Sequence, residues 1–283
     1  MRRRHGIDLH GRRVLITGAA RGIGAALARR LHARGARVAL AGLEPELLAE
    51  VAADCGNAPW RECNVADNDQ VERSVAELVA ELGGLDIVIA NAGIAAQLPL
   101  VGGDVTVMER TVQVNVMGAY YTLRAAGEHI AHPGGYALAV SSAGAAVHLP
   151  LMGAYSASKA AVEALGNTLR IELSPSGARV GVAYFAELDT DMTSRGFGTK
   201  AAEAMGAQGS FTGASALEPA IDRIERGIAA RARRIVAPWW VAPLLPVRMF
   251  AQPVIDWRAR KGLAEGLDIA RNEHARLTTD QPD

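Results

Sequence analysis

Tyr155 and Lys159 are residue types that can transfer protons, and they are four residues apart. A spacing of four residues places both side chains on one face of a helix. A tyrosine hydroxyl has a pKa near ~10 and is a poor base at neutral pH, so it needs a nearby positive charge that favours the phenolate. Lys159 could supply that charge, and Ser142, at the end of an apolar run, could stabilise an oxyanion. These residue types allow general acid/base chemistry with Tyr155 as the proton carrier, but a Tyr-x-x-x-Lys spacing alone occurs by chance in many helices, so its position among the other motifs decides.

A glycine-rich turn near the start of the chain predicts an anion-binding site. The apolar run Val14–Ile16 leads into Gly18, Gly22 and Gly24, and an Ala/Leu-rich amphipathic segment follows. Glycine permits a tight turn and a close approach to a pyrophosphate, and the N-terminus of the next helix attracts the anion. A strand before the turn and a helix after it are the context that a dinucleotide-binding fingerprint requires.

Three motifs in one order resemble the short-chain dehydrogenase/reductase family. They are the spacing Gly-x-x-x-Gly-x-Gly, the element Asn91-Ala92-Gly93 after a later apolar run, and the series Asn115, Ser142, Tyr155 and Lys159, which is similar to the catalytic tetrad of that family. The resemblance implies an NAD(P)-dependent oxidoreductase that transfers a hydride between the nicotinamide and an alcohol or ketone.

The resemblance also implies a role for each member of the tetrad. Tyr155 would be the general acid/base, and Ser142 would bond the substrate oxygen. Lys159 would lower the pKa of Tyr155 and hold the hydroxyls of the nicotinamide ribose. Asn115 would hold a water molecule that connects Lys159 to solvent.

Contacts with the cofactor are implied in the same way. Two positions depart from the family pattern: Asn64 replaces an Asp that bonds the adenine amino group, and Phe185-Ala186 replaces a Pro-Gly pair. An amide oxygen can still accept the adenine bond, without charge assistance. The expected cofactor contacts are Gly18, Arg21, Gly22, Ile23, Gly24, Asn64, Val65, Asn91, Ala92, Gly93, Tyr155, Lys159 and Thr190.

The choice between NAD and NADP depends on the end of the second strand, where NAD users have an acidic residue that bonds the ribose 2′-OH. Gly42 stands there, and Arg21 resembles the basic residue of many NADP users, whereas Leu43 stands where other NADP users have Arg. Glu44 could supply a carboxylate two residues later, or could simply lead into the helix that Pro45 opens. These positions favour NADP(H) over NAD(H).

The elements that position these residues alternate along the chain between short aliphatic runs and amphipathic segments, the pattern of βαβ units. The aliphatic runs are continuous, as in parallel strands that are covered on both faces. We expect a Rossmann-type doubly wound α/β fold with a seven-stranded, mostly parallel sheet and helices on both faces. The expected strands are 12–17, 37–41, 58–64, 85–90, 136–141, 179–184 and 234–237, and the expected helices are 23–34, 45–54, 68–82, 105–129, 154–173 and 215–230.

We expect one Rossmann-fold domain over residues 1–283. Its parts would be a cofactor-binding and catalytic core at 10–192, the segment 193–213, which the resemblance implies is a mobile substrate lid, and an apolar C-terminal extension at 235–262. The extension could cap a lipophilic pocket, pack in a subunit interface or make a peripheral contact with a membrane surface. Its prolines and Arg248 argue against a membrane-spanning helix. It favours a hydrophobic alcohol or ketone as substrate, such as a lipid or steroid-like compound.

Composition argues against several other classes of protein. The chain has 30 Lys+Arg and 30 Asp+Glu, and this formal net charge of +0 gives no electrostatic support for nucleic-acid binding. Cys55 and Cys63 have neither zinc nor redox spacing, and His129, His132 and His148 match no metal-ligand motif. We expect no metal ion and a reduced, cytoplasmic chain, and the resemblance implies a homo-oligomer, dimer or tetramer, formed through the helices at 105–129 and 154–173.

Two alternative functions stay open at this point. A relative of this fold can use the bound nucleotide for epimerase or dehydratase chemistry, but the length of the chain and the Ser142–Tyr155 spacing weigh against that. A dinucleotide-sensing binding protein without turnover is the other alternative. Such a sensor has no need for Tyr155 and Lys159 together.

Overall fold

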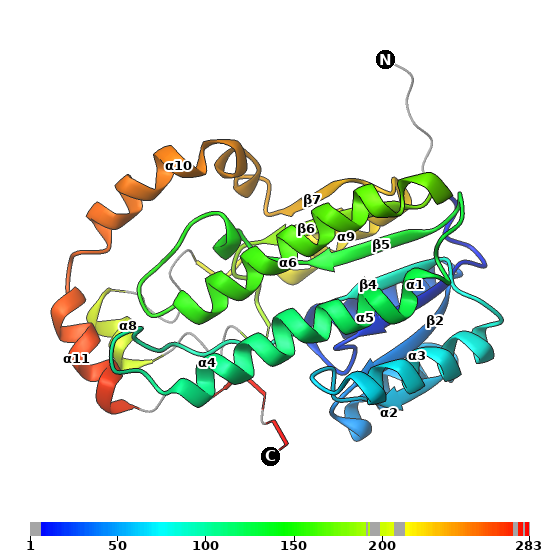
Figure 1. Cartoon of the computed structure of the whole chain (residues 1–283), viewed down its shortest axis with the longest axis horizontal. Helices are drawn as coiled ribbons and strands as arrows, with labels where there is room; N and C mark the ends of the chain where they lie inside the picture. Colours follow the sequence, from blue (N-terminus) through cyan, green and yellow to red (C-terminus); the bar gives the residue numbers. More distant parts are fainter. Residues whose placement is uncertain are drawn as a thin grey trace.

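The structure, a computed structural model, describes residues 7–190, 192, 199–206, 213–273, 277–279 and 281–282. It contains a seven-stranded parallel sheet with the strand order β3-β2-β1-β4-β5-β6-β7 (Figure 1). The chain moves outward from β1 to β3, crosses back to β4 and then moves outward to β7. The predicted doubly wound α/β fold is confirmed.

The strands are β1 Arg13–Thr17, β2 Arg37–Gly42, β3 Trp60–Glu62, β4 Ile87–Ala90, β5 Tyr136–Val140, β6 Arg179–Phe185 and β7 Arg234–Ala237. The helices are α1 Gly22–Ala33, α2 Pro45–Asp54, α3 Asn68–Leu82, α4 Val105–Val112, α5 Gly118–Gly127, α6 Gly153–Glu172, α8 Lys200–Ala204, α9 Leu217–Ala229, α10 Val241–Arg258 and α11 Leu263–Glu273.

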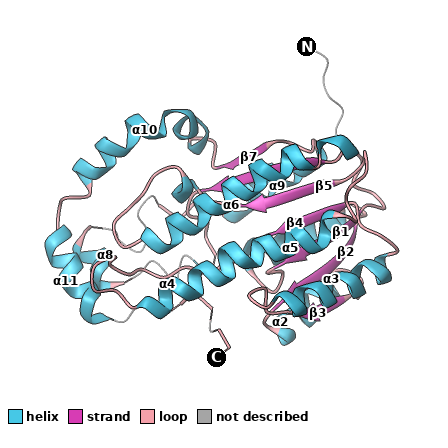
Figure 2. Cartoon of the chain, in the orientation of Figure 1, coloured by secondary structure: helices cyan, strands magenta, loops and turns pink. Residues whose placement is uncertain are grey.

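Helices cover both faces of the sheet (Figure 2). Along β1, Val14 and Ile16 belong to a core that includes side chains of α1, α2 and α9, whereas Leu15 belongs to a second core with α3 and α5. Successive side chains of a strand point to opposite faces, so a strand that is covered on both sides must be apolar throughout. This is why the continuous aliphatic runs predicted the strands.

The segment 105–129, which we predicted to be a single helix, contains a π-helical turn. The α-helix α4 ends at Val112, the π turn spans Gln113–Met117, and α5 continues from Gly118 to Gly127. Sequence periodicity does not distinguish this wide turn from an ordinary helical one. It carries Asn115, whose side chain bonds the loop after β4.

The apolar C-terminal extension contains the helix α10, which we did not predict. Two prolines inside it, Pro246 and Pro253, argued against a helix in the sequence. A proline in a helix removes one backbone hydrogen bond and favours a kink. The helix begins against the sheet edge, where Val241, Trp240 and Leu245 pack with Val182 and Tyr184. Among the described residues, none of the helices combines the length and the apolar character that crossing a bilayer requires.

Part of the predicted lid lies outside the described residues, namely 193–198 and 207–212. The described residues 199–206 contain α8, which packs against α11. The carboxylate of Glu273 at the end of α11 accepts hydrogen bonds from the backbone N–H groups of Lys200 (2.8 Å) and Ala201 (3.1 Å). This contact joins residues 200 and 201 to helix α11.

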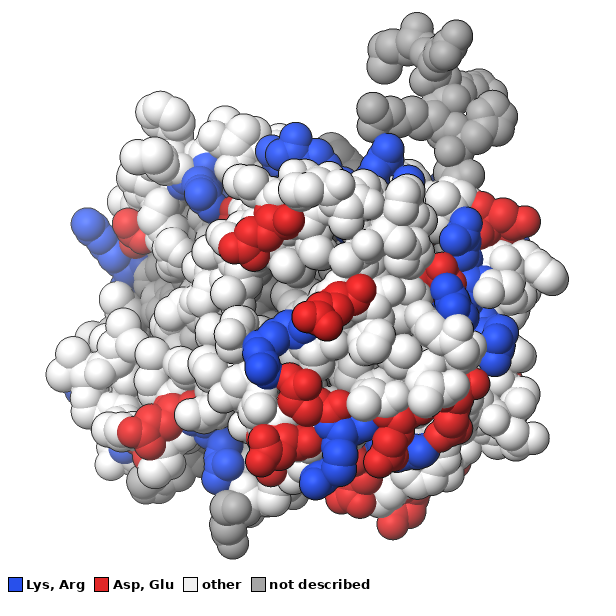
Figure 3. All heavy atoms as spheres, turned by 45° about the vertical axis from the view of Figure 1, so that its right-hand side comes forward, with Lys and Arg blue, Asp and Glu red and all other residues white. Residues whose placement is uncertain are grey.

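Acidic and basic side chains are intermingled on the face that Figure 3 presents. The described residues include surface ion pairs, such as those of Arg61 with Glu77 and Glu81 of α3 and of Arg124 of α5 with Glu72. On this face the two signs of charge neutralise each other locally, as the balanced composition predicts.

Candidate active site

A cavity of about 230 Å³ lies where the carboxyl ends of the central strands meet. The glycine turn after β1 lines one end, and Ser142, Tyr155 and Lys159 line the other. Most of the predicted site residues therefore meet in one place. Three predicted site residues among the described ones do not line this cavity, namely Gly24, Asn64 and Asn115. Gly24 lies against Gly18 and Asn115 bonds Ile94, both of which line the cavity, and Asn64 bonds Ala66, the neighbour of the lining residue Val65.

The glycine turn is built for a close approach of backbone. Gly18 has a φ of +65°, and a Cβ on it would lie 2.7 Å from the Cα of Ala92. A Cβ on Gly24 would lie 2.1 Å from the carbonyl oxygen of Gly18. Helix α1 begins at Gly22 without an acidic residue in its first turn, and Gly22 and Ile23 line the cavity. This cradle fits a dinucleotide, whose pyrophosphate would lie against the N–H groups of the helix start.

Asn91 connects the ends of β1 and β4. Its Nδ2 donates hydrogen bonds to the carbonyl oxygens of Thr17 and Gly18, both at 3.1 Å, and its backbone N–H donates to Thr17 Oγ1 (3.2 Å). The amide thus fixes the first residue of the glycine turn. Ala92 and Gly93, the next residues of this loop, also line the cavity.

Asn115 is buried, with 1% of its surface exposed, and braces the same loop from the π turn. Its Oδ1 accepts from the backbone N–H of Ile94 (2.7 Å), and its Nδ2 donates to the Ile94 carbonyl and to Ser158 Oγ, both at 2.9 Å. A Cβ on Gly93 would lie 3.2 Å from both Asn115 Oδ1 and Lys159 Nζ. Asn115 therefore lies next to Lys159, and its side chain binds protein groups.

Ser142, Tyr155 and Lys159 form a compact group at the other end of the cavity. The Ser142 and Tyr155 side chains are hydrogen-bonded to each other. Ser142 Oγ also accepts from the backbone N–H of Gly144 (3.1 Å), which fixes the position of the hydroxyl. Lys159 Nζ lies 5.7 Å from the centre of the Tyr155 ring and donates to the Val140 carbonyl (3.1 Å).

Burial dominates the electrostatics of this group. It raises the pKa of Tyr155, the hydrogen bond with Ser142 lowers it, and the carboxylate of Glu187 raises it, with a net increase. Burial also lowers the pKa of Lys159 to about 8. In this structure the pKa of Tyr155 is thus above its usual value, so a base at neutral pH needs a further positive charge in the cavity.

Arg21 lies at the rim, with 17% of its side chain exposed. Its Nη2 is 3.1 Å from Glu44 Oε1 and donates to Thr279 Oγ1 (2.7 Å) and to the Thr278 carbonyl (3.5 Å). The two residues that sequence reasoning weighed for the ribose site therefore contact each other. Gly42 and Leu43 line the cavity beside them.

Asn64 serves a local turn. Its Oδ1 accepts from the backbone N–H of Ala66, and its own N–H donates to Gln70 Oε1, both at 3.0 Å. Its neighbours Cys63 and Val65 line the cavity. Thr190 lines it as well, and its Cβ would lie 3.7 Å from a Cβ on Gly22.

Sequence reasoning missed the C-terminal residues Thr278, Thr279 and Gln281, which also line the cavity. Thr279 bonds a side chain that is 258 residues earlier in the chain. No local pattern in the sequence marks such a contact.

The α10 helix touches the site indirectly. Gln252 Nε2 donates to the carbonyl of His148 (3.0 Å), and the His148 N–H donates to Gln252 Oε1 (2.9 Å). This pair holds the loop after Ser142. Among the described residues, the cavity lining includes none from α10, and its large apolar side chains Met249, Phe250 and Trp257 are exposed.

Comparison with known proteins identifies the family. The short chain dehydrogenase family model matches residues 12–201. An uncharacterized oxidoreductase of Mycobacterium tuberculosis is 33% identical over 255 residues, which are 87% of this chain and 96% of the relative. The 11-beta-hydroxysteroid dehydrogenase 1A of Arabidopsis thaliana is 30% identical over 267 residues, which are 89% of this chain and 76% of the relative.

A solved structure of NAD⁺-bound xylitol dehydrogenase matches with a TM-score of 0.60 and 29% identity, over 62% of this chain and 70% of that one. The chain belongs to the short-chain dehydrogenase family. It is accordingly an NAD(P)-dependent oxidoreductase.

Proposed function

We propose that Tyr155 is the general acid/base for transfer of a hydride between NADP(H) and the alcohol or carbonyl carbon of a lipophilic small molecule. The observation that carries the proposal is the meeting of Ser142, Tyr155 and Lys159 at one end of a cavity that has the glycine turn at its other end. When bound, the nicotinamide supplies or accepts the hydride and, in its oxidised form, adds a positive charge.

The chain's own residues move the proton. In oxidation, Tyr155 takes the proton of the substrate hydroxyl, and Ser142 holds the substrate oxygen while charge develops on it. The ammonium of Lys159 and the added positive charge favour the phenolate that burial disfavours. A pKa of about 8 lets Lys159 lose and regain a proton near neutral pH. Reduction follows the same steps in reverse.

The Tyr155→Phe variant tests this role. We expect turnover with NADPH and apolar ketones to fall about 1000-fold, because general acid catalysis is lost. The dissociation constant for NADPH, measured by nucleotide fluorescence, should stay within about twofold, since the hydroxyl is not needed for the pyrophosphate. Turnover that survives in the variant would contradict the mechanism, and nucleotide binding without turnover in the wild type would favour a sensor.

The preference for NADP(H) rests on Arg21. Its bonds to the described residues all use Nη2, so Nε and Nη1 can still donate to a 2′-phosphate. Glu44 opposes a phosphate at the same place and would favour the 2′-OH of NAD(H). Arg21→Met should weaken NADPH binding about tenfold and NADH binding much less. Glu44→Gln is the matched variant and should shift selectivity toward NADPH. If the wild type prefers NADH, the proposal that NADP(H) is the cofactor is wrong.

A lipophilic substrate is supported by the apolar lining near Tyr155, which includes Val147, Leu149 and Met152. The names of the similar proteins point in two directions, to a steroid and to xylitol. A panel that pairs cyclic apolar ketones with ketoses separates the two, and we expect the apolar members to give the higher kcat/KM.

We also propose a domain organisation, an oligomer contact and a cellular compartment for this protein. A single domain over residues 1–283 is supported by two cores that share one sheet. The helices of the segments 105–129 and 154–173, namely α4, α5 and α6, would form the homo-oligomer contact. The exposed apolar face of α10 would contact a second copy of the chain or a membrane surface. Light scattering and sedimentation with anionic vesicles measure these contacts. Free, buried Cys55 and Cys63 fit a reducing compartment such as the cytoplasm.

A further inference from the structure

The C-terminal segment Leu277–Thr279 is fixed in the wall of the cavity. Thr278 is buried, with 3% of its surface exposed. Its backbone N–H donates to the carbonyl of Ala95, and the N–H of Ala95 donates to Thr278 Oγ1, both at 3.0 Å. Leu277 packs against the core that contains Val88 and Ile94. The segment is therefore attached to the loop that follows β4 through Asn91.

The same segment reaches the opposite wall. Arg21 Nη2 donates to Thr279 Oγ1 (2.7 Å) and to the carbonyl of Thr278 (3.5 Å). Arg21 is the residue before helix α1, whose first turn faces the cavity. The C-terminal segment thus bridges the loop after β4 and the glycine turn after β1, which are the two loops that the fold provides for a dinucleotide.

The hydroxyl of Thr279 is placed to act on an anion. A threonine hydroxyl has one proton to donate and two lone pairs to accept with. Here it accepts from Arg21, so the proton can point away from the guanidinium and into the cavity. Arg21, the Thr279 hydroxyl and the N-terminus of α1 then surround one region of the cavity, a combination that favours phosphate oxygens, whereas the Glu44 carboxylate, 3.1 Å from Arg21, opposes them.

We infer that Leu277–Thr279 form part of the dinucleotide site and that Thr279 donates a hydrogen bond to an anionic oxygen of the bound cofactor. This inference rests on the proposed function, since it assumes that the cavity binds a dinucleotide. It adds the end of the chain to a site that the family motifs place in the first two thirds of the sequence.

The test compares four full-length proteins and one shortened chain by NADPH fluorescence titration and by stopped-flow dissociation. Thr279→Val removes the hydroxyl and Thr279→Ser keeps it. As a control, Thr106→Val removes an exposed hydroxyl on α4, which donates to Asp104 just before that helix. The shortened chain ends after Arg276. Thermal unfolding of every protein shows whether it is folded.

We expect Thr279→Val to raise the dissociation constant about fivefold, mainly through faster release, and Thr279→Ser and Thr106→Val to leave it within about twofold. The shortened chain should bind NADPH about 30-fold more weakly, because Arg21 then also loses its hydrogen bonds to Thr278 and Thr279. Unchanged or tighter binding in Thr279→Val overturns the inference, and tighter binding in the shortened chain would show that the segment blocks the site. If the wild type binds neither NADPH nor NADH, the proposed function fails as well.

Discussion

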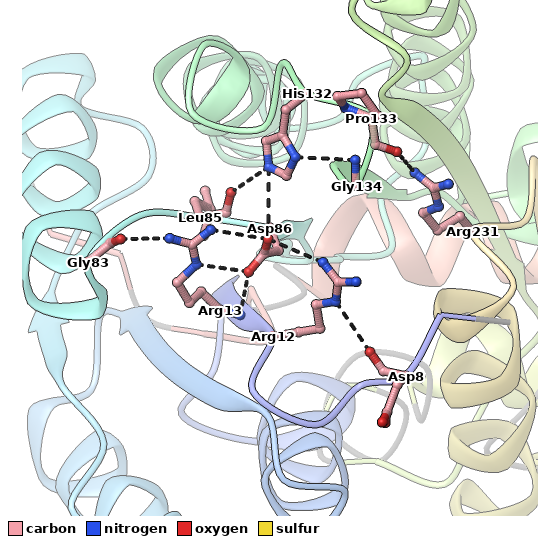
Figure 4. Close-up of polar contacts among 10 residues, drawn as sticks. All are labelled: Asp8, Arg12, Arg13, Gly83, Leu85, Asp86, His132, Pro133, Gly134 and Arg231. Carbon is pink, nitrogen blue, oxygen red and sulfur yellow. Dashed lines mark hydrogen bonds and ion pairs between the residues drawn. The ribbon is translucent and has the colours of Figure 1, made fainter.

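A buried charge is compensated differently at the carboxyl ends and at the amino ends of the parallel strands, here called the carboxyl edge and the amino edge of the sheet. At the carboxyl edge, Lys159 is buried and its ammonium donates to a carbonyl, that of Val140. At the amino edge, Asp86 is also buried, but Arg13 bonds it through Nε (2.8 Å) and through its backbone N–H (3.0 Å), with Arg12 and His132 beside it (Figure 4).

The pKa values follow from this difference. Burial alone would raise the pKa of Asp86, but the hydrogen bonds from Arg13 outweigh it and hold the pKa below its usual value. Burial of Lys159 has no such counterweight and lowers its pKa to about 8. Matched charge supports the fold at one edge, whereas the shifted group at the other edge is available for proton transfer near neutral pH.

Breaking the matched pair should have the largest effect. We expect Asp86→Asn to lower the free energy of unfolding by about 3 kcal/mol, because the buried carboxylate is removed and Arg13, which is 29% exposed, loses its charged partner. The contribution of Asp86 is present above the unfolded pKa of about 4 and disappears as the pH falls through the lower native pKa. Urea denaturation at several pH values measures the loss in the variant and the pH dependence in the wild type. Asp54→Asn, which breaks an exposed pair with Arg29, is the control and should cost less than about 1 kcal/mol; equal losses would contradict the comparison.

At the carboxyl edge we expect the loss in rate to exceed the loss in stability. Ser142→Ala should lower kcat about 100-fold, because a donor to the developing oxyanion is removed. It should also move the pH profile of kcat/KM to higher pH, since the hydrogen bond with Ser142 lowers the pKa of Tyr155. The cost in unfolding free energy should be about 1 kcal/mol. A pH profile that does not move would separate Ser142 from the titration of Tyr155.

Removing the shifted charge should stabilise the protein. Lys159→Met should raise the free energy of unfolding at pH 7 by about 2 kcal/mol, less than the roughly 3 kcal/mol that the pKa shift implies, because the Val140 carbonyl loses its donor. Wild-type stability should rise between about pH 8 and 10, where the unfolded chain binds more protons than the folded one. The advantage of the variant therefore fades over that range. An advantage that persists at pH 10 would show that the charge is not its source.

The smallest effect is expected at the amino end of β5, the strand that leads to Ser142. Tyr136 is buried there, and its hydroxyl donates to the Ala232 carbonyl (2.9 Å). Tyr136→Phe should cost about 1 kcal/mol of unfolding free energy and leave kcat unchanged. A fall in kcat would mean that the two ends of the strand are coupled.

Much of the fold was predictable because strands that are covered on both faces leave a local signal. The runs at 14–16 and 87–90 are apolar at every position, and the glycine turn between strand and helix is local as well. The predicted third strand, 58–64, is shorter in the structure, with Trp60–Glu62 paired. Its position at the sheet edge explains the mixed composition that blurs its ends.

The rest depends on contacts that a local pattern does not contain. The partnership of Arg21 with Glu44 and Thr279 joins three distant segments. Helix α10 continues through Pro246 and Pro253, although proline disfavours the interior of a helix, and only its start packs against the sheet, through Trp240, Val241 and Leu245 among the described residues. The pKa of Tyr155 also depends on tertiary structure, since burial and Glu187 raise it against the expectation from Lys159.

The π turn at Gln113–Met117 sets the angular phase between the two halves of one long helix. Each residue of an α-helix advances the side-chain direction by about 100°, so one additional residue rotates everything before it relative to everything after it by that angle. Deleting one residue within this turn would let a regular helix form, but α4 would then be turned against α5. If α5 kept its packing on α3, Asn115 could then no longer face Ile94, which lines the cavity. The length of this turn, to within one residue, therefore determines the geometry of the cavity wall.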